Sequence, residues 1–152
     1  MIERGRGNIL EANVQALVNP VNCVGVMGKG LALTFKEIYP NNFLEYRTAC
    51  NAGKVIPGKM FITKTDSVIN PAYIINFPTK RHWREGSRIE DIRSGLVSLA
   101  EEVNRLRIFS VAIPALGCGN GGLKWEDIES LIITAFVQLP EVSVILFPPQ
   151  GI

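Results

Sequence analysis

The chain has 152 residues, of which 47% are hydrophobic and 20% are charged, and its formal net charge is +2. This size and composition are typical of one folded domain and exclude a disordered chain. The small net charge excludes binding of nucleic acid through an overall cationic field, although local clusters can still bind it. We expect residues 1–152 to form a single domain, which would be the N-terminal one if the natural protein is longer.

The predicted elements alternate between strands and helices along the chain. In chain order they are strands at 16–21, 61–64, 73–77, 109–113 and 142–147, and helices at 31–38, 41–51, 88–107 and 125–139. This alternation predicts βα units and a largely parallel sheet, so the fold class is α/β. At the start of the helix at 88–107, Ser87 and Glu90 fit a capping box, in which both side chains satisfy unpaired backbone N–H groups.

Cysteine and histidine usage argues against a metal site and against a disulfide framework. Cys23, Cys50 and Cys118 are far apart and lack a CxxC pair, and His82 is the single histidine. Structural zinc sites need several such ligands at short spacings. We therefore expect no metal, no cofactor and a reducing cytoplasmic location. The N-terminal residues lack the apolar segment of a signal peptide, and no apolar run approaches the roughly 20 residues that span a membrane.

Two glycine-rich segments each follow a predicted strand and precede a predicted helix. We call residues 25–30 the first glycine loop and residues 117–122 the second glycine loop. In open α/β sheets, ligands bind beyond the carboxyl ends of the strands, where helix N-termini present unpaired N–H groups that suit a phosphate. Glycine permits the close backbone approach that such a site needs. The sequence therefore predicts one pocket for a phosphate-bearing ligand.

The first glycine loop belongs to neither common nucleotide-binding motif. A Walker A motif needs glycine where Cys23 stands and Ser or Thr where Gly30 stands, and the spacing does not match GxGxxG. Before the loop, we interpret Asn19 as a residue that closes a turn through its side chain. For Asn22, a role in the turn and a bond to sugar hydroxyls are equally open.

The richest polar segment follows the predicted strand at 73–77 and reads Thr79-Lys80-Arg81-His82-Trp83-Arg84. A solvated basic loop is the common alternative, but cations beside Trp and His suit nucleic-acid backbone contacts and base stacking. Cationic neighbours lower the pKa of a lysine and raise its share of nucleophilic amine, which favours Lys80. His82 is an alternative general acid or base without a carboxylate nearby in sequence. For Cys118, near a helix start that favours a thiolate, we expect a packing role.

Together these segments resemble the macrodomain family, whose members bind ADP-ribose and in many cases remove it from targets. The resemblance covers nearly the whole chain and rests on Gly7-Asn8-Ile9, on residues 16–22, on the first glycine loop and on Ile-Pro-Ala-Leu-Gly-Cys-Gly-Asn-Gly-Gly-Leu at 113–123. It implies a three-layer α/β/α fold around a mixed, mostly parallel central sheet. Many macrodomains have an aspartate where Asn8 stands, which alters the expected contact with the adenine amine.

The resemblance also implies a layout for bound ADP-ribose, as ligand or product. Adenosine lies near Asn8, Ile9 and Phe147, the two loops grip the diphosphate, and Asn22 orients the distal ribose. The implied contact residues are Asn8, Ile9, Asn22, Gly28, Lys29, Gly30, Leu31, Thr79, Gly117, Cys118, Gly119, Asn120, Gly121 and Phe147.

Within the family, Asn-Phe-Pro-Thr-Lys80 and Gly-Cys-Gly-x-x-x-Leu-x-Trp125 are similar to the branch of the bacterial DarG antitoxins and their eukaryotic glycohydrolase relatives. This implies an ADP-ribosyl glycohydrolase that removes ADP-ribose from thymidine in single-stranded DNA, as antitoxin to a DarT-like DNA ADP-ribosyltransferase. Lys80 is then the catalytic residue and attacks the ribose anomeric carbon. The eukaryotic relatives add an aspartate where Gly121 stands. The implied DNA contacts are Arg81, His82, Trp83 and Arg84.

Three alternative functions stay open, as does a direct contact with the DarT-like toxin. The first is a reader that binds ADP-ribose without catalysis, and Lys80 is the residue that favours an enzyme over it. The second is a hydrolase of protein-linked or O-acetyl-ADP-ribose, against which the segment 79–84 favours DNA. The third is a plain nucleic-acid-binding domain, which would leave both phosphate loops without a purpose.

Overall fold

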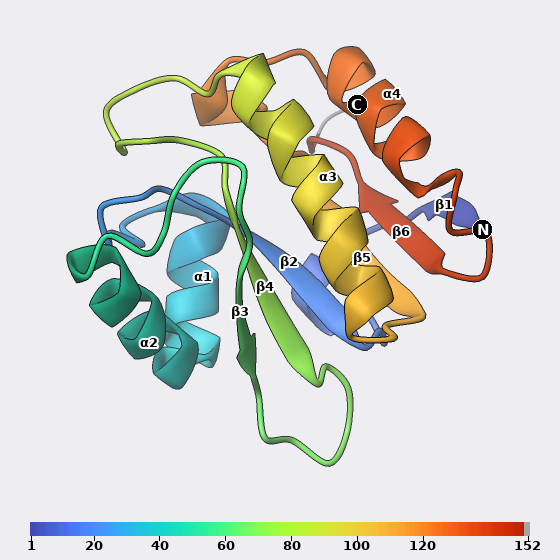
Figure 1. Cartoon of the computed structure of the whole chain (residues 1–152), viewed down its shortest axis with the longest axis horizontal. Helices are drawn as coiled ribbons and strands as arrows, with labels where there is room; N and C mark the ends of the chain where they lie inside the picture. The colour runs from blue at the N-terminus through green and yellow to red at the C-terminus, as the bar shows by residue number, and fades with distance from the viewer. Residues whose placement is uncertain (151–152) are drawn as a thin grey trace.

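The computed structural model describes residues 1–150, which form three layers (Figure 1). The middle layer is a six-stranded sheet of order β1-β6-β5-β2-β4-β3. All neighbouring strands are parallel except β3 and β4, which are antiparallel. The strands are β1 (Ile2–Arg4), β2 (Ala16–Val21), β3 (Phe61–Lys64), β4 (Tyr73–Pro78), β5 (Ser110–Pro114) and β6 (Ser143–Phe147).

Helices cover both faces of this sheet, α1 and α2 on one side and α3 and α4 on the other (Figure 1). The expected three-layer α/β/α fold with a mixed, mostly parallel sheet is therefore confirmed. Each strand and helix predicted from the pattern agrees with the structure to within three residues at either end, whereas β1 and both 3-10 turns escaped the pattern. The helices are α1 (Gly30–Ile38), α2 (Pro40–Asn51), α3 (Ile89–Arg105) and α4 (Trp125–Phe136), and the 3-10 turns are η1 (Ile9–Glu11) and η2 (Gly119–Gly121).

The core is divided by the alternation of side chains along the strands. On β2, Val18 points to the larger cluster under α3 and α4, while Leu17 packs with Phe35 of α1 on the other face. Helix α3 lies close to the sheet at Gly95, because a Cβ there would lie 2.4 Å from the Phe77 ring. Burial on both faces explains why these strands are continuous apolar runs.

The pairing of β2 with β4 places the ends of these strands side by side. Val21 pairs with Pro78, and beyond this pair the Val21 carbonyl accepts from the backbone N–H groups of Thr79 and Lys80 at 2.8 and 3.4 Å. The chain that follows β2, which carries the first glycine loop, and the chain that carries Lys80 therefore leave the sheet together.

Asn19 does not close a turn, so that prediction was wrong. It lies inside β2, fully buried, and its Nδ2 donates to Oδ1 of Asn76, its register partner on β4, at 3.1 Å. Asn76 in turn exchanges hydrogen bonds with Asn42 of α2, and Thr63 of β3 donates to Asn42 at 2.7 Å. Asn19 thus belongs to a buried polar network between distant segments, although the local sequence predicted a turn there.

The expected capping box at Ser87 and Glu90 is also wrong. Helix α3 begins at Ile89, and its N-cap residue, Arg88, makes no side-chain capping bond. The backbone N–H of Ser87 instead donates to the carbonyl of Gly121 in the second glycine loop at 2.9 Å. Ser87 therefore lies before the helix and is hydrogen-bonded to a residue that is remote in sequence.

Candidate ligand-binding site

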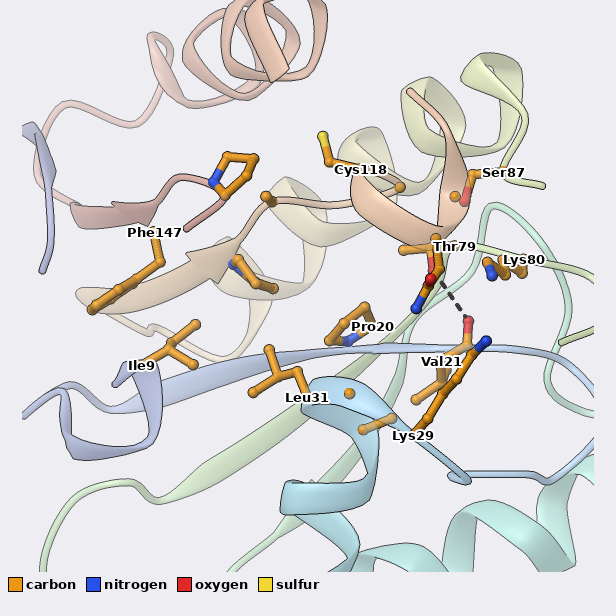
Figure 2. Close-up of a pocket in the computed structure, with 18 of the residues that line it drawn as sticks. Ile9, Pro20, Val21, Lys29, Leu31, Thr79, Lys80, Ser87, Cys118 and Phe147 are labelled. Carbon is orange, nitrogen blue, oxygen red and sulfur yellow. Dashed lines mark hydrogen bonds between the residues drawn. The ribbon is translucent and has the colours of Figure 1, made fainter. Parts of the chain in front are cut away.

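A cavity of about 930 Å³ opens beyond the carboxyl ends of the central strands, between the two glycine loops (Figure 2). This volume is in the range of sites for small molecules and cofactors. Most residues predicted to bind the ligand border it: Asn8, Ile9, Asn22, Gly28, Lys29, Gly30, Leu31, Thr79, Lys80, Trp83, Gly117, Cys118, Asn120, Gly121 and Phe147.

Some of the predicted contact residues lie outside the cavity lining, and the lining also contains residues that were not predicted to contact the ligand. Gly119, Arg81, His82 and Arg84 are not among the lining residues in the described part of the chain. The lining residues that were not predicted as contacts are Gly7, Pro20, Val21, Val26, Ala32, Ser87, Pro114, Ala115, Pro148, Pro149 and Gln150, although Val26 lies within the first glycine loop that was predicted to form the pocket. Most of these are small or apolar, and no residue-type signal marks them.

The cavity has an apolar end and a polar end. Figure 2 shows Ile9 and Phe147 at one end and Lys29, Lys80 and Ser87 at the other. Two apolar side chains facing one space suit the flat ring of a nucleobase, and two lysines suit anionic groups. The ends are therefore suited to the two chemically different halves of a nucleotide ligand.

The apolar end is shaped by glycine. A Cβ at Gly5 would lie 2.6 Å from the ring of Phe147, so only glycine leaves room for the aromatic side chain there. Asn8 lies beside this end, and its Oδ1 accepts from the Leu10 backbone N–H at 3.0 Å. That bond caps the 3-10 turn η1, so Asn8 has a structural task besides any contact with a base.

The first glycine loop is organised by the side chain of Asn22. Its Oδ1 accepts from the N–H groups of Val24 and Val26 at 3.1 and 3.3 Å, and from the Tyr46 hydroxyl at 2.7 Å. Its Nδ2 donates to the carbonyl of Val26 at 2.7 Å. The structural role that the sequence left open is thus present, and one N–H of Nδ2 is left for a sugar hydroxyl.

The loop leads directly into the N-terminus of α1, which faces the cavity. The helix begins at Gly30, and Lys29 at the N-cap makes no side-chain capping bond. The first-turn N–H groups at Gly30 and Leu31 therefore carry the positive end of the helix dipole toward the space that Lys29 also borders. This is the arrangement that binds a phosphate.

The second glycine loop is a backbone structure. Gly117, Gly119 and Gly122 have φ angles of +74°, +66° and +83°, which other residues rarely adopt. Cys118 lies between them, and burial and the nearby Glu126 raise its pKa to about 11. The side chain is therefore a neutral thiol, as its expected packing role requires.

Lys80 opens onto the polar end of the cavity. Burial lowers its pKa from the usual range, and the positive charge of Lys29 lowers it further. No Asp or Glu is among the lining residues in the described part of the chain. The amine therefore has no carboxylate partner in the cavity, and a larger share of it is neutral and nucleophilic.

The four residues that follow Lys80 are held in different ways. Arg81 forms a two-pronged ion pair with Asp91 of α3 at 3.1 and 3.2 Å, which occupies its guanidinium. Trp83 lines the cavity and is 41% exposed. The Arg84 guanidinium lies 4.6 Å from the centre of the Trp83 ring, and the His82 ring centre lies 5.2 Å away.

His82 is turned toward its own loop. Its Nδ1 accepts from the backbone N–H of Arg84 at 3.1 Å, and it does not line the cavity. This placement argues against His82 as the general acid or base. Among residues 1–150, no group of three His, Cys, Asp or Glu side chains is placed to hold a metal ion, and no helix there is long and apolar enough to cross a membrane.

The fold and the cavity are those of an α/β domain whose two glycine loops are suited to the phosphates of a nucleotide. A sequence model described as "Macro domain" matches residues 18–132, so the chain belongs to the macrodomain family. The chain is 52% identical over 151 residues to a protein of Mycobacterium tuberculosis named DNA ADP-ribosyl glycohydrolase, covering 99% of this chain and 43% of that protein. The solved macrodomain of Mycobacterium tuberculosis DarG superposes with a TM-score of 0.98 at 52% identity, covering 99% of each chain.

A more distant relative joins two activities in one name. A DNA ADP-ribosyl transferase-DNA ADP-ribosyl glycohydrolase fusion protein of Thermosipho africanus is 34% identical over 158 residues, covering 94% of this chain and 40% of that protein. This chain therefore spans less than half of the length of these curated relatives.

Proposed function

We propose that this macrodomain is an ADP-ribosyl glycohydrolase that removes ADP-ribose from thymidine in single-stranded DNA. The observation that carries the proposal is the amine of Lys80 at the polar end of the cavity, with a lowered pKa and no carboxylate among the described lining residues. The names of the relatives from Mycobacterium tuberculosis and Thermosipho africanus support the same reaction.

The ligand is ADP-ribose in the orientation that the two ends of the cavity favour. Adenine lies against Ile9 and Phe147, and the diphosphate lies between the α1 N-terminus and the second glycine loop. The distal ribose then reaches the polar end, where Lys80 lines the wall. Binding of the nucleotide half holds the anomeric carbon beside the amine, which makes the attack effectively intramolecular.

The reaction proceeds in two displacements at the anomeric carbon. The neutral amine of Lys80 forms a C–N bond as the bond from this carbon to the thymine nitrogen breaks. The electron pair leaves with the base, which takes up the proton that the lysine nitrogen loses. Water then adds to the anomeric carbon, its hydrogen passes to the lysine nitrogen, and ADP-ribose and the free amine result. One water molecule is consumed in total.

The wall around Trp83 is the side from which DNA enters. Trp83 is exposed, lines the same cavity as Lys80 and carries the Arg84 guanidinium over its ring, so it offers both a stacking surface and positive charge. The ion pair of Arg81 with Asp91 of α3 holds the loop that carries Trp83 in place. We place Trp83 and Arg84 against the modified strand.

The biological role that fits this reaction is that of an antitoxin to a DarT-like DNA ADP-ribosyltransferase. The Thermosipho africanus fusion protein supports it, because its name joins transferase and glycohydrolase in one chain. Direct contact with the toxin, a cytoplasmic location and a further domain in a longer protein belong to the same proposal.

Product analysis tests the proposal. The protein is mixed with a thymidine-modified ADP-ribosylated oligonucleotide and, separately, with ADP-ribosylated glutamate protein. We expect free ADP-ribose and unmodified DNA from the first mixture. Lys80→Ala should lower this rate at least about a thousandfold and keep ADP-ribose affinity within a few-fold, because the residue acts on the reacting bond. Lys80→Arg is the matched control, since arginine keeps the charge but stays protonated.

Each other outcome points to a different function. Tight ADP-ribose binding without release from either substrate would make the domain a reader. Release from protein alone would move the activity to the ester linkage. Release from DNA by Lys80→Ala at the native rate would overturn the lysine mechanism.

A further inference from the structure

Among the described residues that line the cavity, Ser87 carries a buried hydroxyl without a hydrogen-bond partner. Its Oγ is shielded from solvent and makes no hydrogen bond within residues 1–150. Burial of an unpaired hydroxyl is unfavourable, and native proteins rarely leave one without a purpose. The capping role that the sequence suggested does not account for it, because α3 begins without a side-chain cap.

The hydroxyl is wedged between two glycines of the second loop. A Cβ at Gly121 would lie 2.4 Å from Ser87 Oγ, and one at Gly117 would lie 3.3 Å from it. The Ser87 N–H also donates to the Gly121 carbonyl at 2.9 Å. The second glycine loop is therefore fitted around this serine, and the room that side chains at 117 and 121 would need is taken by Ser87.

Ser87 also belongs to the polar end of the cavity. It borders the cavity, and Figure 2 shows it on the same side as Lys80 and Thr79. The Thr79 hydroxyl is already directed at the Val21 carbonyl at 3.5 Å. Ser87 thus supplies an unused hydroxyl at the same end of the cavity as Lys80, and that end has no carboxylate in its described lining.

We infer that the Ser87 hydroxyl binds a hydroxyl of the distal ribose and thereby orients the anomeric carbon toward Lys80. This inference rests on the proposed function, because it takes ADP-ribose as the ligand. A serine hydroxyl both donates and accepts, as a ribose hydroxyl does, so the two groups pair in either direction. A rotation about χ1, the one torsion between backbone and hydroxyl, turns Oγ from the glycines into the space that Ser87 borders.

A single substitution tests this inference through two ligands. ADP carries the adenosine and diphosphate of ADP-ribose but lacks the distal ribose. In the full chain, we expect Ser87→Ala to weaken ADP-ribose binding roughly threefold to tenfold, the worth of one hydrogen bond, and to leave ADP binding unchanged. The melting temperature should stay the same or rise, since no hydrogen bond within the protein is lost.

Ser98→Ala is the matched control. Ser98 is also partly buried, but its Oγ accepts from the Met60 N–H at 3.2 Å, and it does not border the cavity. Its replacement should lower the melting temperature and leave both affinities unchanged. Ser87→Ala is therefore expected to change the ADP-ribose affinity but not to lower the melting temperature, and Ser98→Ala to do the reverse. A general effect of losing a hydroxyl would not separate the two variants in this way.

Two results would overturn the inference. Equal weakening of ADP and ADP-ribose in Ser87→Ala would mean that the hydroxyl serves the phosphate loop, and unchanged ADP-ribose affinity would mean that it serves no ligand. Failure of the proposed function has a different signature, because a wild-type protein that binds ADP-ribose without releasing it from DNA still shows the ligand difference at Ser87.

Discussion

The two glycine loops border one cavity but keep their shape by different means. The first loop has positive φ angles at its two ends, Gly25 and Gly30, and its interior is held by the side chain of Asn22. The second loop has three glycines with positive φ, and in the described structure its one side-chain hydrogen bond is a long contact from Cys118 Sγ to the Leu116 carbonyl at 3.8 Å.

The two loops are therefore sensitive to different substitutions. The first loop depends on one polar side chain whose bonds reach α2 through Tyr46. The second depends on residues that lack a side chain, since an added Cβ would meet Leu123 at Gly117 and Ser87 at Gly121, and Gly119 and Gly122 have positive φ angles. The two loops of one cavity are thus held by a hydrogen-bond network on one side and by glycine conformations on the other.

The largest effect on folding should come from Asn22→Ala. The substitution removes the acceptor of the Val24 and Val26 N–H groups, and it removes one of the two acceptors of the Tyr46 hydroxyl, which keeps the Asn22 carbonyl at 2.8 Å. Since each unpaired buried group costs about 1–3 kcal/mol, we expect the free energy of unfolding to fall by about 2–4 kcal/mol. Urea unfolding measures the change.

Tyr46→Phe is the companion variant, because it removes one donor to Asn22 and keeps the ring. Alone it should cost about 1 kcal/mol, and in the Asn22→Ala background less, since one of the two bonds from the Tyr46 hydroxyl to Asn22 is already lost there. Fully additive losses would show that the network does not hold the loop.

A smaller effect is expected for alanine in the second loop. Gly117→Ala places a Cβ 2.8 Å from Leu123 at a φ of +74°, and we expect a loss of about 1–3 kcal/mol. Gly28→Ala in the first loop is the comparison, because its nearest neighbour would be Val26 Cγ1 at 3.3 Å and its φ is not in the left-handed region. Its loss in unfolding free energy should stay below about 1 kcal/mol. Equal losses would remove the distinction between the loops.

The smallest effect links the loops to the chemistry. Lys29 lowers the pKa of Lys80, so its charge favours the neutral amine. Activity should rise as pH increases through the pKa of Lys80, because deprotonation supplies the nucleophile. Lys29→Gln removes the charge, raises the pKa of Lys80 and moves the inflection of kcat to higher pH. Lys29→Arg keeps the charge and should keep the native profile; an unmoved inflection in Lys29→Gln would contradict the coupling.

The elements that local pattern decides were predictable from the sequence. Helix α3 follows from apolar residues at spacings of three and four, and the strands follow from short apolar runs between turn residues. Strand β1 was not predicted because Ile2–Arg4 is short and two of its three residues are charged, and it pairs with β6 alone. Glycine content marked both loops, since positive φ angles leave a direct signature in residue type.

The rest of the site depends on contacts between distant segments. Asn19 and Ser87 were misplaced because their partners, Asn76 and Gly121, are remote in sequence. Lys80 was indicated by its position after a strand, but burial and Lys29, rather than the neighbours in its own segment, lower its pKa. The strand order decides which backbone atoms lie close together across the cavity. That order cannot be predicted from any single segment of the sequence.

The pairing of β2 with β4 limits where the length of this chain can change. The backbone N–H of Lys80 donates to the carbonyl of Val21. One residue deleted from β2 or β4 would turn the side chains of that strand beyond the deletion to the opposite face of the sheet. It would thereby separate the Lys80 amine from the first glycine loop. The connection between β3 and β4 lies at the other end of β4, and Val68 within it is fully exposed. A fluorophore or affinity tag inserted at that connection would leave the cavity intact, whereas the same insertion near Pro78 would abolish it.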